Sequence, residues 1–132
     1  MSKKNYSSGN PDTKSDFYVE FTPAKLGEIK IDIQSKTYIL HGSKLVNTAK
    51  QTLADLGIKH GNLSVIDNGG QYFVLQARIE ASIKLAYPNI RAESLPKINK
   101  HSLYKSKRDR FRRSRLYLPG NQAKLMLNAG IH

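Results

Sequence analysis

The chain has 132 residues, of which 39% are hydrophobic, no cysteine, and a formal net charge of +12. This length suits one domain of ordinary size with a modest core. The lack of cysteine excludes a disulfide scaffold, a thiolate metal site and a cysteine nucleophile. Residues 1–96 hold 12 Lys/Arg and 9 Asp/Glu, whereas residues 97–132 hold 10 Lys/Arg and one Asp. The basic character therefore belongs to the C-terminal part.

The N-terminal residues 1–14 are polar and include Gly9 and Pro11. They contain no apolar stretch of the kind that a signal peptide needs. Nowhere does the sequence have the roughly 18 consecutive apolar residues of a membrane span. We therefore expect a mobile lead-in over residues 1–14, no membrane partner and a location in the cytoplasm.

Two segments after the lead-in show the period-two alternation of half-buried strands. The first is DFYVEFTP, which ends at Pro23, and the second is EIKIDIQS. The apolar positions that share a face are Phe17, Val19 and Phe21 in the first segment, and Ile29, Ile31 and Ile33 in the second. The four residues 24–27 between the segments predict a hairpin loop.

A helix is predicted next, with Ser43 as its N-cap and Gly57 at the position of a left-handed C-cap. Its apolar face consists of Leu45, Ala49, Leu53 and Leu56, which recur at helical spacing. The segment NLSVID then predicts a third strand, and Asn68-Gly69-Gly70 predicts a turn after it.

A second helix is predicted over about residues 71–85, with a strand-like start as the alternative. Leu75, Ile79, Ile83 and Ala86 share one helical face, and Pro88 ends the helix. The order strand, strand, helix, strand, helix predicts an α+β sandwich, in which helices cover one face of a small sheet. Residues 88–110 lack an apolar period and predict a basic linker.

Few residues suggest independent catalysis or metal binding. The four histidines, His41, His60, His101 and His132, form no ligand pattern. Asp55 and Glu80 are predicted on the polar sides of the two helices, and no acid pair suits general acid–base chemistry. We therefore expect no metal site and no enzyme activity of this chain on its own.

The run Lys105–Arg115 contains seven Lys/Arg, one Asp and Phe111. Such a run suits the phosphate backbone of RNA or DNA, but no stacking platform or recognition helix accompanies it. A solvated linker, or a segment that docks on an acidic partner, is the preferred interpretation, and a nucleic-acid partner is the less favoured one.

Residues 15–86 resemble the acyl carrier protein, or gamma chain, of bacterial citrate lyase. The resemblance rests on the Ser-Asp start of the first strand, on IKIDIQS, on Leu56-Gly57-Ile58 and on Ala77-Arg78-Ile79-Glu80-Ala81. Gly70-Gln71-Tyr72 departs from the family's usual Gly-Ala-Leu. The implied domain covers residues 15–87.

The signature R-R-S-x-L-(F/Y)-(V/L)-P-G-N of the citrate lyase beta chain and its aldolase relatives is present as Arg112 to Asn121. Those relatives are TIM barrels, which need eight strands. Residues 111–132 would therefore be an incomplete first strand–helix unit of such a barrel, with the catalytic residues of the barrel absent.

The carrier resemblance implies a phosphoribosyl-dephospho-coenzyme A group on a serine, loaded by a prosthetic-group transferase and presented to the alpha and beta chains or to the chain's own barrel. The family's motif is E-S-(S/G)-D, and Lys14 stands where its serine would be. Ser15 is therefore the candidate attachment residue. The alternatives are that Ser15 only begins the strand, and that the domain is an unmodified docking or assembly domain.

Overall fold

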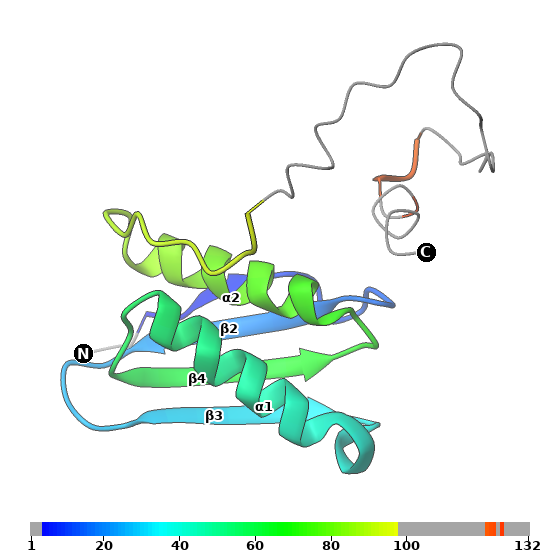
Figure 1. Ribbon diagram of the computed structural model, residues 1–132, viewed down its shortest axis with the longest axis horizontal. Helices are drawn as coiled ribbons and strands as arrows, with labels where there is room; N and C mark the ends of the chain where they lie inside the picture. The colour runs from blue at the N-terminus through cyan, green and yellow to red at the C-terminus, as the bar shows by residue number, and fades with distance from the viewer. Residues whose placement is uncertain (1–3, 98–120, 124, 126–132) are drawn as a thin grey trace. The chain divides into compact units, whose positions relative to one another are not determined.

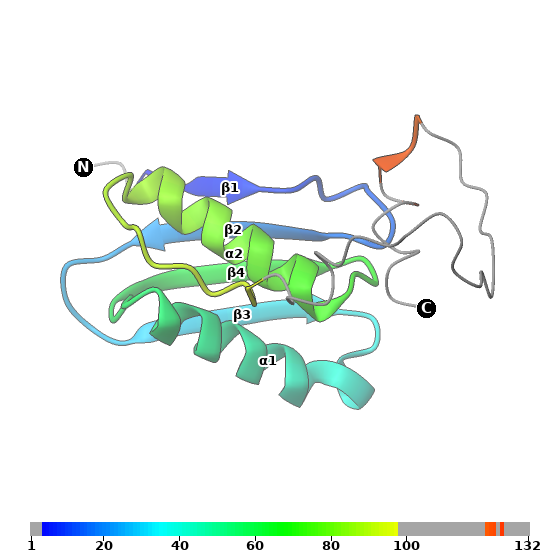
Figure 2. The ribbon, with the colours of Figure 1, turned by 45° about the horizontal axis from the view of Figure 1, so that its top comes forward.

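The computed structural model describes residues 4–97, 121–123 and 125. The chain divides into two units, residues 1–97 and 98–132, and the fold below is that of the first unit. Its described elements are the strands β1 (Tyr6–Ser8), β2 (Phe17–Pro23), β3 (Ile29–Ser35) and β4 (Gly61–Asp67), and the helices α1 (Tyr38–Asp55) and α2 (Tyr72–Ala86). Both helices cover the same face of one sheet (Figure 1, Figure 2). The predicted α+β class is confirmed.

The core lies between the sheet and the two helices. Its members are Phe17, Val19, Phe21, Leu45, Ala49, Leu53, Leu56, Leu63, Val65, Leu75, Ile79 and Ile83. Every residue of this set that belongs to β2 or α2 is fully buried. The alternation of the strands and the helical spacing of the apolar residues therefore predicted the buried faces correctly. Each strand and each helix buries only the one face that lies between the sheet and the helices.

The predicted hairpin at residues 24–27 is wrong. The strand order is β1-β2-β4-β3, so β4 lies between β2 and β3. Val65 of β4 pairs with Val19 on one side and with Ile33 on the other, antiparallel to β2 and parallel to β3. A parallel pair needs a crossover connection, and α1 supplies it. The loop length suited a hairpin, but β4 lies at the centre of the sheet, and β3, which carries the charged Lys30 and Asp32, lies at the edge.

Helix α1 begins earlier than predicted. Thr37, not Ser43, precedes its first residue, and no side chain caps it. The first turn carries exposed apolar residues, so the periodicity of the core face gave no signal for it. The end of the helix was predicted correctly. Gly57, two residues after the last helical residue Asp55, has the left-handed φ of +72° that glycine adopts without strain.

Strand β1 lies within the segment that was predicted to be a mobile lead-in. Tyr6 to Ser8 pair antiparallel with Phe21 to Val19 of β2. Three residues are too short to show a period-two pattern, which is why composition alone suggested a flexible segment. Helix α2 begins at Tyr72, so the alternative of a strand-like start is also wrong.

The first part of the predicted linker packs on the helices. Just before this linker, the centre of the Tyr87 ring lies 6.2 Å from that of Phe21 in β2, and Ile90 of the linker packs against the core. The Ser94 N–H donates to Glu80 Oε2 at 2.9 Å, and the Ser94 hydroxyl donates to Asp55 Oδ2 at 2.9 Å. Glu80 is therefore buried, with 7% of its surface exposed. Its predicted place on a polar face is wrong because this segment covers it.

Most predictions for the C-terminal part of the sequence concern residues that the structure does not describe. The predicted linker over 98–110, the run Lys105–Arg115 and most of the predicted strand–helix unit over 111–132 lie outside the described residues, as do His101 and His132. Ala123 and Leu125 are helical, and the Leu125 N–H donates to the Gln122 carbonyl at 3.0 Å. A helix was predicted there, but the predicted barrel stays a prediction.

Candidate functional site

One end of the sheet gathers the loops that carry the candidate serine. Strand β2 runs antiparallel to β4, and β3 runs parallel to β4. The start of β2, the ends of β3 and β4, and the starts of both helices therefore meet at one end (Figure 1). We call this the serine end, and we call the opposite end of the sheet the far end. Loops at the carboxyl ends of parallel strands are a common place for binding sites.

Ser15 lies exposed in the turn before β2. Its φ of +55° makes it the one non-glycine residue with a left-handed backbone in the described part of the chain. Its N–H donates to the Asn68 carbonyl at 2.8 Å, and the Asn68 N–H donates to the Asp16 carbonyl at 3.1 Å. These bonds continue the β2–β4 pairing by one step. Among the described residues no hydrogen bond uses the Ser15 hydroxyl, so Ser15 itself is held through its backbone N–H.

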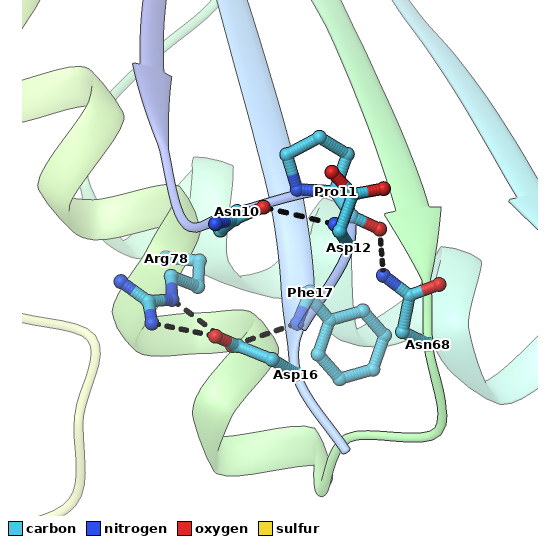
Figure 3. A network of polar contacts seen from close by, with 7 residues as sticks. All are labelled: Asn10, Pro11, Asp12, Asp16, Phe17, Asn68 and Arg78. Carbon is cyan, nitrogen blue, oxygen red and sulfur yellow. Dashed lines mark hydrogen bonds and ion pairs between the residues drawn. The ribbon is translucent and has the colours of Figure 1, made fainter. Parts of the chain in front are cut away.

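Asn68 also ties the loop between β1 and β2 to the end of β4. Its side-chain amide donates to the Pro11 carbonyl at 2.6 Å, and the Asp12 N–H donates to Asn10 Oδ1 at 2.9 Å (Figure 3). The sequence predicts Asn68 only as part of a turn. Its role in holding the serine loop depends on a contact between distant segments, for which the sequence contains no local signal.

Asp16 anchors the same turn to helix α2. Arg78 donates to Asp16 from Nε at 3.1 Å and from Nη2 at 2.7 Å, and the Phe17 N–H donates to Asp16 Oδ1 at 2.7 Å (Figure 3). The Asp16 side chain is only 11% exposed. A forked, charge-assisted contact of this kind fixes geometry as well as charge. Asp16 and Arg78 were both noted in the family motifs, but their pairing was not predicted.

A cleft of about 320 Å³ opens beside this turn. Its lining includes Lys14 from the serine loop, Lys36 and Thr37 from the β3–α1 connection, and Asp67 and Asn68 from the end of β4. Asp67 accepts hydrogen bonds from the Ser35 hydroxyl and from the Gly69 N–H, both at 2.7 Å. The cleft is open and mixed in charge, as is suitable for a surface on which a group is displayed.

The remaining candidates do not form a second site. His41 Nδ1 lies 3.5 Å from the Tyr72 hydroxyl, and His60 contacts the Gly27 carbonyl at the far end. No group of three His, Asp or Glu residues suited to a metal ion occurs among residues 4–97. A larger cleft, of about 600 Å³, lies at the far end between Ile58, Tyr87 and neighbouring residues. None of the helices in this part of the chain is long and apolar enough to span a membrane.

Asp55 and Glu80 meet at Ser94, although the sequence predicts them to be dispersed. Burial raises the pKa of Glu80, but the hydrogen bond from Lys84, the Ser94 N–H and the charge of Lys84 together outweigh it. The net pKa of Glu80 is therefore lowered. A lowered pKa does not suit a general acid, which needs a raised one, and the Glu80 carboxylate instead accepts hydrogen bonds from Lys84 and Ser94.

The fold and this turn define a small α+β domain that displays a serine at the open end of its sheet. Residues 7–86 match the family model described as ACP, malonate decarboxylase delta subunit (MdcD). Because the match covers more than half of the chain, the chain belongs to this acyl carrier family.

Curated relatives agree with this assignment. The citrate lyase acyl carrier protein of Fusobacterium nucleatum is 33% identical over 69 residues, which are 52% of this chain and 73% of the relative. That of Klebsiella pneumoniae is 35% identical over 68 residues, 52% of this chain and 70% of the relative. That of Clostridium perfringens is 32% identical over 69 residues, 52% of this chain and 68% of the relative. The resemblance to citrate lyase carriers over residues 15–86 is thereby confirmed, and the family match ends at residue 86.

Proposed function

We propose that the domain is an acyl carrier of a citrate lyase-type complex, and that Ser15 holds its prosthetic group. The observation that carries the proposal is the exposed Ser15 hydroxyl, which no hydrogen bond among the described residues occupies, in a domain of an acyl carrier family. The group would be phosphoribosyl-dephospho-coenzyme A, whose thiol carries the acyl group as a thioester.

The residues around Ser15 suit attachment of a phosphate-linked group. The Ser15 oxygen forms a new bond to phosphorus, the polyphosphate of the donor leaves as an anion, and the hydroxyl proton passes to a base of the transferase. The Asn68 and Asp16 contacts hold the backbone on both sides of the serine, so the hydroxyl is presented at a fixed place. Lys14 and Lys36 border the adjacent cleft, where positive charge favours a phosphate diester.

The role of this chain is presentation rather than catalysis. A group tethered to a domain reaches partner sites at a high effective concentration, without a new binding event for each step. The partners would be lyase and transferase subunits that perform the chemistry. The beta-chain signature at Arg112 to Asn121 supports the further proposal that residues 111–132 begin a lyase barrel. We propose the cytoplasm as the location of such a complex.

A second candidate is an unmodified docking or assembly domain of a lyase. Two observations favour it. Lys14 occupies the position of the family's attachment serine, and Ser15, at the position where the family has serine or glycine, has the left-handed φ of +55°. Glycine is the usual residue for that backbone, so Ser15 then serves only the turn.

Intact-mass measurement separates the two candidates. The full chain is incubated with a citrate lyase prosthetic-group transferase and its coenzyme A-derived donor, and the modified peptide is mapped. We expect a mass gain in the wild type and in the control Ser7→Ala, and none in Ser15→Ala. No gain in the wild type, under conditions in which the transferase modifies a citrate lyase acyl carrier protein, would assign the domain to the docking role.

A further inference from the structure

The first turn of α1 exposes apolar side chains beside the candidate serine. Ile39 is 99% exposed and Leu40 is 79% exposed, and Tyr38 is 48% exposed. Of the six large hydrophobic residues that are exposed in the described part of the chain, these three are consecutive. We call Tyr38–Leu40 the apolar turn. Single exposed apolar residues need no explanation, but a cluster of them marks an interaction site.

The local structure keeps the apolar turn in this position. The Leu40 and His41 N–H groups both donate to the Thr37 carbonyl at 3.0 Å, which fixes the helix start. Gly42 is buried, and a side chain there would collide with the Tyr38 ring. The Tyr38 ring therefore lies over Gly42, on the helix, while Ile39 and Leu40 remain exposed.

The apolar turn and Ser15 each follow a residue that lines the same cleft. Thr37, which precedes the turn, and Lys14, which precedes Ser15, both line the cleft of about 320 Å³. A protein that acts on a group at Ser15 must approach this end of the sheet. Ile39 and Leu40 lie exposed at this same end of the sheet.

The charges beside the apolar turn indicate what would cover it. Lys14 and Lys36 line the cleft, and Lys44 of α1 lies with its Nζ 4.3 Å from the centre of the Tyr72 ring. The carboxylates of the cleft are Asp12 and Asp67, so the three lysines outnumber them by one. The excess of lysine suits a partner surface that carries carboxylates.

The chain's own C-terminal part has the wrong charge for this surface. Residues 97–132 hold 10 Lys/Arg and one Asp, so the lysines near the turn would repel them. A membrane is also a poor fit, because three residues form a much smaller apolar face than an interfacial helix presents.

We infer that the apolar turn and the lysines around it form a docking surface for a folded partner protein with an apolar pocket bordered by carboxylates. The inference rests on the proposed function only for the identity of that partner, a lyase-type subunit. Ile39 and Leu40 enter the pocket, and the lysines orient the approach so that the group on Ser15 faces the partner's active site.

The test compares two sets of exposed residues at opposite ends of the fold. Ile39→Asp/Leu40→Asp replaces the two most exposed residues of the apolar turn. Leu26→Asp is the matched control, because Leu26 is 85% exposed and lies at the far end, between β2 and β3. Lys36→Glu is paired in the same way with Lys59→Glu, since Lys59 borders the far-end cleft. Binding of each unmodified full chain to purified citrate lyase alpha and beta chains, freed of their own carrier, is measured by calorimetry.

We expect Ile39→Asp/Leu40→Asp to weaken binding by at least about 10-fold, as for residues at the centre of an interface. Lys36→Glu should weaken it less, and by an amount that shrinks as salt rises. Both controls should bind like the wild type. Circular dichroism of each variant should be unchanged, because the replaced side chains lie outside the core.

Other outcomes overturn the inference. No binding by the wild type, or an equal loss of binding in Leu26→Asp, would show that the apolar turn is not the docking surface. Self-association of the wild type that Ile39→Asp/Leu40→Asp abolishes would assign the turn to a second copy of this chain. Binding to anionic phospholipid vesicles that depends on Ile39 and Leu40 would assign it to a membrane. The result is independent of modification at Ser15. Binding that needs the apolar turn, in a chain that the transferase never modifies, supports the docking surface and refutes the carrier role. Modification of Ser15 with no role for the turn supports the carrier role and refutes the docking surface.

Discussion

The two ends of the sheet are built by different means. At the serine end, backbone hydrogen bonds of Asn68 and the Asp16–Arg78 ion pair hold the turn, and Ser15 remains exposed. At the far end, the chain after α2 folds back, so that Tyr87 meets Phe21 and Ser94 joins the two helices. Polar contacts fix a backbone without covering it, whereas packing needs burial. The serine end, which leaves Ser15 exposed, is therefore held by hydrogen bonds and an ion pair rather than by apolar packing.

The largest expected effect comes from two glycines with the same φ angle, one at each end of the sheet. Gly9 and Gly27 both have φ +98°. A Cβ at Gly9 would overlap the Phe17 carbonyl oxygen, but at Gly27 it meets nothing within 4 Å. We expect Gly9→Ala to lower the free energy of unfolding by about 2–3 kcal/mol, and Gly27→Ala by about 1 kcal/mol or less. Urea unfolding measures both. Equal losses would show that the loop between β1 and β2 moves away from the Phe17 carbonyl without a cost in stability.

The next effect comes from the ion pair of the serine end. Asp16→Asn keeps the shape but removes the charge that Arg78 contacts, and we expect a loss of about 2 kcal/mol. The double variant Asp16→Asn/Arg78→Met should lose less than the sum of the two single changes, because the two groups act together. Strict additivity in urea unfolding would contradict the role of this pair as an anchor.

The sequence predicted the packed parts of this molecule better than the polar parts. The faces of β2, α1 and α2 follow from periodicity, because burial of one face imposes it on every residue of an element. The place of β4 between β2 and β3 could not be predicted, since a short loop is compatible with either arrangement. Ser15 was found through a family motif, whereas Asn68 and the Asp16–Arg78 pair join residues more than 50 positions apart. No local pattern encodes such contacts.

Where the segment after α2 covers the helices, Glu80 makes the stability of the fold depend on pH. Its pKa in the folded chain lies below the ordinary value of 4.5, so its contribution to stability is present above pH 4.5 and is lost as the pH falls through the folded pKa. Glu80→Gln should cost about 1 kcal/mol at neutral pH, because the amide still accepts from Ser94 but has no charge for Lys84. The stabilities of wild type and variant, followed by thermal unfolding, should converge in acid. A gap that is constant with pH would exclude an electrostatic origin.

The smallest expected change in stability is at Ser15 itself. Glycine adopts φ +55° without the steric cost that serine bears, but it loses more entropy on folding. The two terms nearly cancel, and we expect Ser15→Gly to stabilise the chain by about 0.5 kcal/mol or less. Ser15→Ala should be slightly destabilising, because it keeps the Cβ at the same backbone angle. Both variants lack the hydroxyl, so both should lose modification while differing in stability. If Ser15→Gly were modified as well as the wild type, the group would reside on another residue of the loop, and the exposed turn would serve only to hold that loop in place.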